Sequence, residues 1–426
     1  MNGPKVLWIS PTIGSNFGGP TTTVVNGLIA EKRAGLESSL ISTHSDADPA
    51  QTAPASARLA AGDVTFRLFP RTRLLPKAEA WGFSPRMVLW MIRNLRRYDV
   101  VHLQYVWCLS SICGAVISRL HGVPVVVTPH ESLTDYDIDV ASRSRLKRRV
   151  KLVLRRFYLR MVDRLVFMSE LEQRDTRHGS VPGALIRHAV QEKPLPVEPP
   201  ATSPADESLH IAFLGRAIPK KGIDLIIETL GRNRGRNWRL SIAGPPGTGE
   251  FTDEMARLAE KLGVAGNVTW LGYMERIEDL FRQCDVLVMP SAYEGFGMVT
   301  AEAMGHGLPV IVPRRSGVAE IVDHFGAGIV MPESSVDSLD RALKVMDEGP
   351  AVRRSFAERG IRAANATLTY EAFASSTFGL YASLLVARDR CRLREQQHGQ
   401  QEPCRDVEVP LEDVIGDETG YHVDQQ

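Results

Sequence analysis

The chain has 426 residues, a length that predicts two domains because one hydrophobic core usually serves fewer. Its formal net charge of +1 argues against a dedicated nucleic-acid-binding protein, and its apolar fraction of 43% is that of a globular protein. The five cysteines are scattered and odd in number, so neither a disulfide framework nor a zinc site is indicated, and a reducing compartment is expected.

The N-terminal apolar stretch, within residues 1–14, is too short for a signal peptide and leads directly into a strand pattern. No apolar run approaches the roughly 20 residues that are needed to cross a bilayer. We therefore expect a cytoplasmic protein, with peripheral contact to the cytoplasmic face of the inner membrane as an open option.

The first part of the chain alternates strand and helix patterns. The opening strand, residues 6–10, leads into a loop that carries Gly18 and Gly19. A helix then begins near Thr21. Such a loop offers backbone amides to a phosphate, and a plain tight turn is an equal interpretation of a Gly-Gly pair. Further strands are predicted at residues 38–43, 98–103, 123–128 and 163–169, and residues 184–190 close the first unit.

His130 follows the strand at residues 123–128. Ligands of open α/β sheets bind outside the carboxyl ends of the strands, so a histidine at this place meets whatever binds there. Two aspartate runs resemble metal-binding carboxylates, and the first lies in a loop with no neighbouring ligand. A solvated turn is the favoured interpretation of the first run and an acidic surface loop that of the second. The runs are Asp46 with Asp48, and Asp135 with Asp137 and Asp139.

Residues 143–160 pack nine basic residues into eighteen positions, with apolar residues at helical spacing between them. This pattern predicts a basic amphipathic helix. Three interpretations stay open: a solvated face packed on its own domain, a patch for an anionic membrane surface or phosphate-bearing acceptor, and, least favoured, a nucleic-acid site.

Residues 191–208 contain five prolines and no periodicity, which indicates an interdomain linker. The first domain is therefore expected over residues 1–190 and the second over residues 209–368, where strands and helices alternate again. This alternation predicts an α/β fold of two doubly wound, Rossmann-like domains with parallel sheets, facing each other across a cleft.

The stretch from Asp285 to Gly305 reads as a buried strand, a glycine-bearing loop and a helix. A helix N-terminus favours an anion such as a pyrophosphate, because its first amides are unpaired and the helix dipole is positive there. In this stretch those amides are expected to be the ones of Gly297, Met298 and Val299.

Four charged residues make this stretch a candidate ligand site. Glu294 in the loop and Glu302 in the helix can accept hydrogen bonds from hydroxyl groups of one ligand. Arg216 and Lys221 follow the first strand of the second domain, and a guanidinium and an ammonium can together hold one diphosphate. On spacing alone, these are equally four solvated surface charges. Because all four fall at carboxyl ends of strands in one domain, a sugar-nucleotide site is favoured.

Four blocks of the second domain carry a specific resemblance: GRAIPKKGIDLII, SIAGPPGTG, NVTWLG and PSAYEGFGMVTAEAMGHGLPVI. In this order they resemble the retaining glycosyltransferases of glycosyltransferase family 4, which adopt the GT-B fold. The first domain agrees more loosely through FGGPTTTVVNGL, YDVVHLQ and VPVVVTPH. The resemblance covers the whole second domain and parts of the first.

The resemblance implies roles for the matched residues of the second domain. Arg216 and Lys221 would hold the donor diphosphate and stabilise charge on the leaving nucleotide. Glu302 would bind the ribose and Glu294 the transferred sugar. Such enzymes are similar in needing no metal, so no cofactor is expected beside the nucleotide-sugar donor.

In the first domain, the resemblance implies that His130 contacts the sugar near the reacting carbon and that Gly18 or Gly19 lines the pyrophosphate. Two departures concern the acceptor side: Glu131 stands where many relatives have glycine or aspartate, and residues 187–190 (RHAV) replace a more usual Pro-Asn-Gly-Val. Acceptor identity is therefore less defined than activity.

The C-terminal part should contain a helix and a tail. The family's final helix often crosses back to pack on the first domain, and the resemblance implies such a helix over residues 369–390. Residues 395–426 hold nine acidic residues and one basic residue. We expect a disordered acidic tail over residues 391–426.

We expect retaining, metal-independent hexosyl transfer from a nucleotide-diphosphate sugar to an acceptor hydroxyl, with preorganised positive charge stabilising the leaving group. The favoured acceptor is a lipid-linked or membrane-bound glycan of bacterial surface polysaccharide assembly, and nucleic acid is not an expected partner. A GT-B-fold epimerase or phosphorylase and a non-catalytic sugar-nucleotide-binding protein stay open as alternatives. The sequence does not specify the sugar, the nucleotide base or the linkage.

Overall fold

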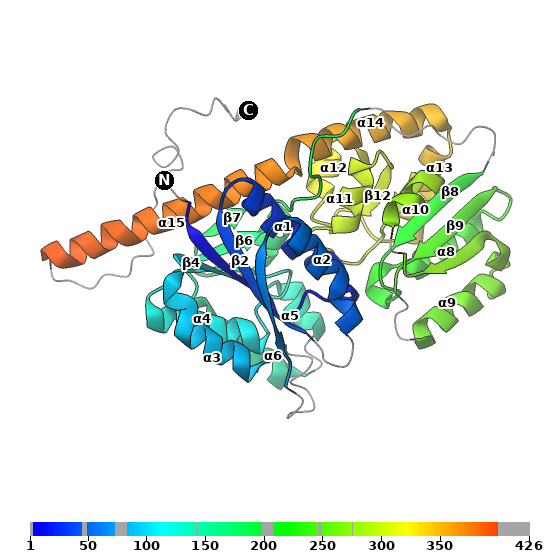
Figure 1. Cartoon of the computed structure of the whole chain (residues 1–426). Coiled ribbons are helices and arrows are strands. Elements are labelled where there is room, and N and C mark those ends of the chain that lie inside the picture. Colours follow the sequence, from blue (N-terminus) through cyan, green and yellow to red (C-terminus); the bar gives the residue numbers. More distant parts are fainter. Residues whose placement is uncertain are drawn as a thin grey trace. The chain divides into compact units, whose positions relative to one another are not determined.

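The computed structural model describes residues 3–44, 49–72, 83–141, 144–197, 208–245, 249–274 and 276–398 (Figure 1). The chain forms two compact units. The first unit consists of Met1–Phe167, Asp175–Ile186 and Tyr370–Gln426, and the second of Met168–Arg174 and Arg187–Thr369. Each unit contains one parallel sheet covered by helices, so the predicted class of two Rossmann-like α/β domains is confirmed.

The seven strands of the first sheet run parallel in the order β3-β2-β1-β4-β5-β6-β7. They are β1 (Lys5–Ile9), β2 (Glu37–His44), β3 (Thr65–Pro70), β4 (Val100–Gln104), β5 (Val125–Thr128), β6 (Arg164–Phe167) and β7 (Gly183–Leu185). The last strand, β7, includes only the first two residues of the segment 184–190 expected to close the first unit. The strand order reverses between β1 and β4, and open α/β sheets bind ligands beside the loops at such a reversal.

Helices cover both faces of the first sheet. They are α1 (Gly19–Arg33), α2 (Ala53–Ala61), α3 (Pro85–Asn94), α4 (Leu109–His121), α5 (Asp135–Ala141), α6 (Arg145–Leu159) and α15 (Tyr370–His398), with the 3-10 turns η1 (Ser15–Phe17), η2 (Pro49–Gln51) and η3 (Leu95–Arg97). One face packs on α3, α4 and α6 through a core that includes Met87, Ile117 and Tyr158. On the other face α1 packs against α15, where the rings of Trp8 and Phe373 lie 6.5 Å apart.

The last helix is longer than the sequence predicts. α15 continues past residue 390 to His398, whereas the sequence predicts a tail from residue 391. The rest of that predicted acidic tail, residues 399–426, lies outside the described residues.

A buried chain of polar side chains joins α15 to the first sheet. A carboxylate oxygen of Glu31 on α1 lies 3.0 Å from the Trp8 indole nitrogen and the other 2.9 Å from the Tyr381 hydroxyl. The same hydroxyl is 2.7 Å from Nδ1 of His102, and Nε2 of His102 is 2.8 Å from the Thr128 hydroxyl. Burial raises the pKa of Glu31 to about 7, against the hydrogen bonds that lower it. All five residues belong to the first unit, so the chain holds α15 in place there.

The six strands of the second sheet also run parallel, in the order β10-β9-β8-β11-β12-β13. They are β8 (Leu209–Leu214), β9 (Trp238–Ala243), β10 (Val268–Gly272), β11 (Val286–Val288), β12 (Val310–Pro313) and β13 (Gly328–Met331). The order reverses between β8 and β11, where Ile211 is opposite Val286. The core strands are continuous apolar runs because both faces of the sheet are covered.

The helices of the second unit are α8 (Ile223–Arg232), α9 (Gly249–Lys261), α10 (Ile277–Gln283), α11 (Met298–Gly305), α12 (Ala319–Phe325), α13 (Val336–Met346) and α14 (Pro350–Thr367), with the 3-10 turns η4 (Pro219–Lys221) and η5 (Ala265–Asn267). A further helix, α7 (Glu170–Asp175), belongs to this unit except for its last residue. α8 packs on α9 and α13, and α11 packs on α14. α8 forms because apolar residues recur three or four positions apart and are buried, namely Ile223, Ile226, Ile227 and Leu230.

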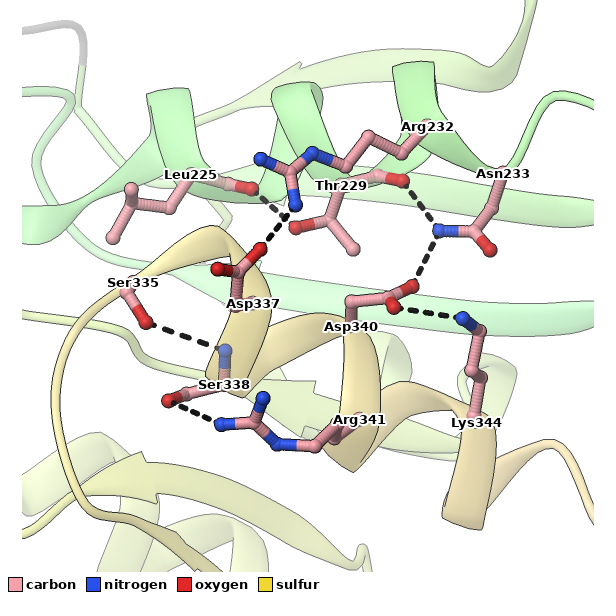
Figure 2. Close-up of polar contacts among 10 residues, drawn as sticks. All are labelled: Leu225, Thr229, Arg232, Asn233, Ser335, Asp337, Ser338, Asp340, Arg341 and Lys344. Atoms are coloured by element: carbon pink, nitrogen blue, oxygen red, sulfur yellow. Dashed lines mark hydrogen bonds and ion pairs between the residues drawn. The ribbon is translucent and has the colours of Figure 1, made fainter.

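Figure 2 shows the polar contacts that fasten α8 to α13. Arg232 pairs with Asp337. The Asn233 side-chain amide donates to a carboxylate oxygen of Asp340 at 2.7 Å, and the ammonium of Lys344 also lies 2.7 Å from that carboxylate. Since α8 starts at the carboxyl end of β8, its last turn lies toward the amino ends of the strands. These contacts are therefore structural and lie away from the loops that bind ligands.

Candidate functional site

The loops after β8 and β11 meet because these strands are neighbours where the strand order reverses. Lys221 ends the first loop's 3-10 turn, and Glu294 lies in the second loop, 73 residues later. The Nζ atom of Lys221 is 2.6 Å from Oε2 of Glu294, and 16% and 19% of the two side chains are exposed. The two predicted charges thus lie together in one largely buried ion pair.

The surrounding cations determine the charge of Glu294. Burial raises its pKa, but the charges of Lys221 and Lys220 and the hydrogen bond from Lys221 outweigh burial, so the net shift of the pKa is downward. Glu294 is therefore a carboxylate at neutral pH. An anionic acceptor and an ammonium donor side by side can bind the hydroxyl and phosphate groups of one ligand.

Gly222 allows the loop that carries Lys221 to touch the end of β11. Its φ angle is +72°, and a Cβ atom placed on it would lie 2.6 Å from the carbonyl oxygen of Pro290. Both the backbone conformation and the close approach require glycine.

We expect Gly222→Ala to destabilise the second unit by about 2 to 3 kcal/mol, because it adds a left-handed alanine and a contact with a backbone carbonyl. Calorimetric unfolding measures this loss. Gly235→Ala is the matched control, since a Cβ atom there meets no atom within 4 Å. Equal melting temperatures for the two variants would contradict the prediction.

The helix predicted after Gly297 begins where the sequence places it. α11 starts at Met298, and Gly297, with a φ angle of +102°, precedes it as the capping residue. Glycine has no side chain to cap the first amides, so those of Met298 and Val299 stay available to an anion at the helix N-terminus. Glu302 lies one turn further along and is partly buried.

Hydrogen bonds to the loop after β12 hold the loop ahead of α11. The amide of Glu294 donates to the carbonyl of Arg315 at 3.0 Å, and the amide of Gly317 donates to the carbonyl of Glu294 at 2.8 Å. A Cβ atom on Gly317 would lie 2.0 Å from the carbonyl oxygen of Gly295. Glu294 is therefore presented on backbone that its neighbours fix.

Further cations surround the ion pair. Arg216 is exposed and lies two residues beyond the end of β8. Lys220 and Arg315 approach the buried ring of Tyr293 at 5.7 and 5.5 Å from its centroid. Sequence reasoning gave Lys220 no role and missed Arg315. The position of Arg315 could have indicated a site residue, because it follows β12, and β12 is the neighbour of β11 in the sheet.

In the first unit, Gly18 and Gly19 lie at the N-terminus of α1. Gly18 caps the helix with a φ angle of +63°, and Gly19 is its first residue, followed by Pro20. The glycine loop after β1 thus leads into the N-terminus of a fifteen-residue helix. Backbone amides at such an N-terminus can bind a phosphate.

His130 stands two residues beyond the end of β5 and is held by residues at and after the end of β4. Its Nε2 atom is 2.7 Å from Oε1 of Gln104, and its ring lies 4.6 Å from that of Tyr105. Burial lowers the pKa of His130 to about 3, so its imidazole is neutral. The sequence predicts His130 as a site residue but not its two neighbours, although β4 lies adjacent to β5.

The second aspartate run forms a helix, so the expectation of an acidic surface loop is wrong. Asp135, Asp137 and Asp139 lie on α5, and each pairs with a cation. The pairs are Asp135 with Arg155 and Arg177, Asp137 with Lys151, and Asp139 with Arg148. Asp46 and Asp48 lie outside the described residues. Within the described ranges, no group of three or more His, Cys, Asp or Glu side chains is arranged to hold a metal ion.

The predicted basic helix turns much of its apolar stripe outward. Five large apolar side chains on α6 are 49 to 72% exposed, namely Leu146, Val150, Val153, Leu154 and Phe157. The helix instead buries the side chains of Arg155, Tyr158 and Leu159. Only part of the apolar stripe that the sequence predicts on this helix therefore packs against its own domain. None of the helices in the described ranges is both long and apolar enough to span a membrane.

A cavity of about 760 Å³ lies beside α12 in the second unit. Its lining includes Arg187, Arg314 and Glu320, and a guanidinium nitrogen of Arg187 is 3.2 Å from Oε1 of Glu320. Lys221 and Glu294 do not line this cavity. The Lys221–Glu294 ion pair is therefore not part of this hollow.

Two family models match the chain. The description "Glycosyl transferases group 1" applies to residues 198–363, and "Glycosyl transferase 4-like domain" to residues 18–187. An uncharacterized glycosyltransferase of Methanocaldococcus jannaschii is 37% identical over 145 residues, 32% of this chain and 36% of the relative. The D-inositol 3-phosphate glycosyltransferase of Kribbella flavida is 27% identical over 310 residues, 68% of this chain and 72% of the relative. The chain thus spans about a third of the archaeal relative's length and about seven tenths of the other's.

Solved structures with the same fold include Anabaena HepE in complex with UDP and glucose, with a TM-score of 0.69 at 17% identity over 89% of this chain and 100% of that chain. Sucrose-phosphate synthase from Thermosynechococcus elongatus has a TM-score of 0.69 at 19% identity over 90% of this chain and 100% of that chain. These likenesses agree with the two parallel sheets described above. The chain belongs to the GT-B glycosyltransferases of the family 4 type.

Proposed function

We propose that the protein transfers a sugar from a nucleotide-diphosphate sugar to an acceptor hydroxyl with retention of configuration. The observation that carries this proposal is the Lys221–Glu294 ion pair at the strand reversal, next to the uncapped start of α11. The ammonium and the amides suit a diphosphate, while Glu294 and Glu302 suit sugar and ribose hydroxyls. The binding of UDP and glucose by a protein of the same fold supports the same donor class.

The proposed reaction occurs on one face of the sugar. The bond between the anomeric carbon and the diphosphate oxygen breaks, and its electron pair stays on the diphosphate. The acceptor oxygen bonds to the same carbon from the same side, and its proton passes to the departing diphosphate. Glu294 accepts a hydrogen bond from Lys221, so it serves as a binding group rather than as a nucleophile. The main task of the protein is to stabilise the leaving group.

Fixed cations take the place of a divalent metal in this proposal. Lys221 and Arg216 follow β8, and Lys220 adds a third positive charge in the same loop. Positive charge at this place neutralises the leaving diphosphate directly. The rate of transfer should therefore be the same in excess EDTA as in excess Mg²⁺.

The experiment that tests the function is a screen of nucleotide sugars by thermal shift and mass spectrometry, followed by transfer to an acceptor panel. The panel includes D-inositol 3-phosphate, the acceptor in the names of several relatives, and lipid-linked glycans. An NMR coupling constant at the anomeric carbon of the product reports retention or inversion. Isomerised donor without acceptor would indicate an epimerase, and binding without turnover would indicate a sugar-nucleotide-binding protein.

We propose further that the acceptor is a lipid-linked or membrane-bound glycan of surface polysaccharide assembly, reached by peripheral binding at the cytoplasmic membrane face. Of the fifteen large apolar side chains that are exposed among the described residues, nine lie on α3, α4 and α6. The sequences of these three helices contain no aspartate or glutamate. An apolar and basic layer of this kind suits an anionic lipid surface.

Co-sedimentation with liposomes tests this surface. We expect the protein to bind vesicles that contain an anionic lipid and to bind neutral vesicles weakly, with added salt weakening the interaction. Val150→Asp/Phe157→Asp should abolish binding, because both side chains are about half exposed on α6. Phe378→Asp on α15 is the control, since Phe378 is also exposed but lies on another helix. Binding that ignores lipid charge would contradict the proposal.

A further inference from the structure

Gln104 is a buried polar residue to which the proposed reaction gives no role. It is the last residue of β4, and its side chain is completely buried. Its Oε1 atom lies 2.7 Å from Nε2 of His130, while its side-chain nitrogen has no hydrogen-bond partner among the described residues. The hydrogen bond to His130 therefore ties this amide to the imidazole, so Gln104 and His130 should act as a pair.

The backbone on both sides of this contact is held in an unusual conformation. Tyr105, His130 and Glu131 have φ angles of +65°, +48° and +67°, which non-glycine residues rarely adopt. The amide of Tyr105 donates to the carbonyl of Thr128 at 3.0 Å, which joins the ends of β4 and β5. Strained backbone of this kind persists where the surrounding structure fixes it, and it is common at functional sites. The strain brings the Tyr105 ring against one side of the imidazole and the Gln104 amide to its Nε2 edge.

We propose that Gln104 is a positioning residue that fixes both the orientation of His130 and its Nε2–H tautomer. The amide oxygen has only lone pairs to offer, so the imidazole nitrogen that faces it must carry the proton. His130 is neutral because of its burial, and one of its two nitrogens therefore holds the single ring proton. This inference rests on the proposed function and on the role that the family resemblance implies for His130, contact with the transferred sugar.

Histidine side-chain ¹⁵N NMR tests the tautomer without any substrate. His130→Gln identifies the signals of His130 in the spectrum. We expect the wild-type protein to show His130 protonated at Nε2, and Gln104→Met to show a mixture of the two tautomers, because methionine fills similar space without an acceptor oxygen. Ser118→Ala removes a buried hydroxyl on α4 and should leave the His130 signals unchanged. A wild-type Nδ1–H tautomer, or an Nε2–H tautomer that persists in Gln104→Met, would overturn the proposal.

Gln104→Glu keeps the acceptor oxygen and adds a charge, so it supplies a second measurement if Gln104→Met does not fold. The carboxylate should raise the pKa of His130 by about 1 to 3 units. The other titratable groups at this place are Tyr105, Glu131 and His102, and all three are unchanged in the variant. An unshifted His130 titration in Gln104→Glu would overturn the proposal.

Kinetics distinguish positioning from a structural role. With the donor selected by the nucleotide-sugar screen, Gln104→Met should lower kcat about tenfold and leave the donor KM unchanged, because the donor charges lie in the second unit. A raised KM with unchanged kcat would count against positioning. Absence of transfer in every protein, wild type included, would instead refute the proposed function, and the NMR result would still decide the tautomer.

Discussion

Lys221→Ala is expected to lower the rate of sugar transfer by about 10² to 10³-fold or more. The substitution removes an ammonium that is already fixed by an ion pair at the strand reversal, at 2.6 Å from Glu294. Removing a preorganised donor that stabilises developing charge costs about 3 to 4 kcal/mol of transition-state stabilisation. The measurement is the release of nucleotide diphosphate at saturating donor and acceptor. Lys261→Ala, on the exposed end of α9, is the control.

The same substitution also leaves Glu294 as a carboxylate without its ammonium partner. Breaking a fully buried pair costs about 3 to 5 kcal/mol, and partial exposure of both side chains reduces this to about 1 to 3 kcal/mol. A second change, Glu294→Gln, removes the unpaired charge. Lys221→Ala/Glu294→Gln should therefore recover melting temperature without recovering transfer.

This pair of variants separates a catalytic role from a structural one. If Lys221 acted only as a structural partner of Glu294, the double variant would regain stability and would transfer sugar as fast as Glu294→Gln alone. If Lys221 took no part in the reaction, Lys221→Ala would turn over as fast as Lys261→Ala. Either result would refute the proposed role of Lys221 in stabilising the leaving group.

The second unit was largely predictable because its signals are local. A continuous apolar run followed by glycines is enough to predict β11 and the start of α11 at Met298. The pairing of Lys221 with Glu294 was less accessible, since the two residues are 73 positions apart. Only the strand order, which no local pattern contains, brings their loops together.

The first unit differs from the sequence predictions at places where tertiary contacts determine the local structure. α2 runs through alanine-rich sequence that the patterns left unassigned, and it buries only Ala55 and Leu59, too few for a clear period. The aspartates of α5 look like a surface loop in isolation, but the cations of α6 and Arg177 pair with them. Gln104 and Tyr105 were missed because neither residue type signals a site until β4 lies beside β5.

The buried polar chain under α15 should make stability depend on pH in an unusual direction. Burial raises the pKa of Glu31 from 4.5 to about 7, so the folded protein binds more protons than the unfolded chain between these values. The contribution of Glu31 to the free energy of unfolding therefore falls as pH rises from about 4.5 to about 7, and it stays at the lower level above that range. The shift corresponds to a loss on the order of 3 kcal/mol. Most native carboxylates, whose pKa is lowered by folding, change stability in the opposite direction.

Glu31→Gln isolates this contribution, because glutamine resembles the protonated acid. Its oxygen can accept from the Trp8 indole and its amide can donate to the Tyr381 hydroxyl, which then donates to Nδ1 of His102. We expect the variant to be less stable than or equal to the wild type at pH 4.5 and more stable at pH 8, with the difference developing between these values. Urea unfolding of both proteins across this pH range measures the difference between their free energies of unfolding. The titration of all other carboxylates cancels in this difference, because both proteins share them. Glu37→Gln, on an exposed carboxylate paired with Lys5, should give no such change. A pH-independent difference for Glu31→Gln would mean that Glu31 is ionised in the folded protein, and that Tyr381, not the acid, donates the hydrogen bond between them.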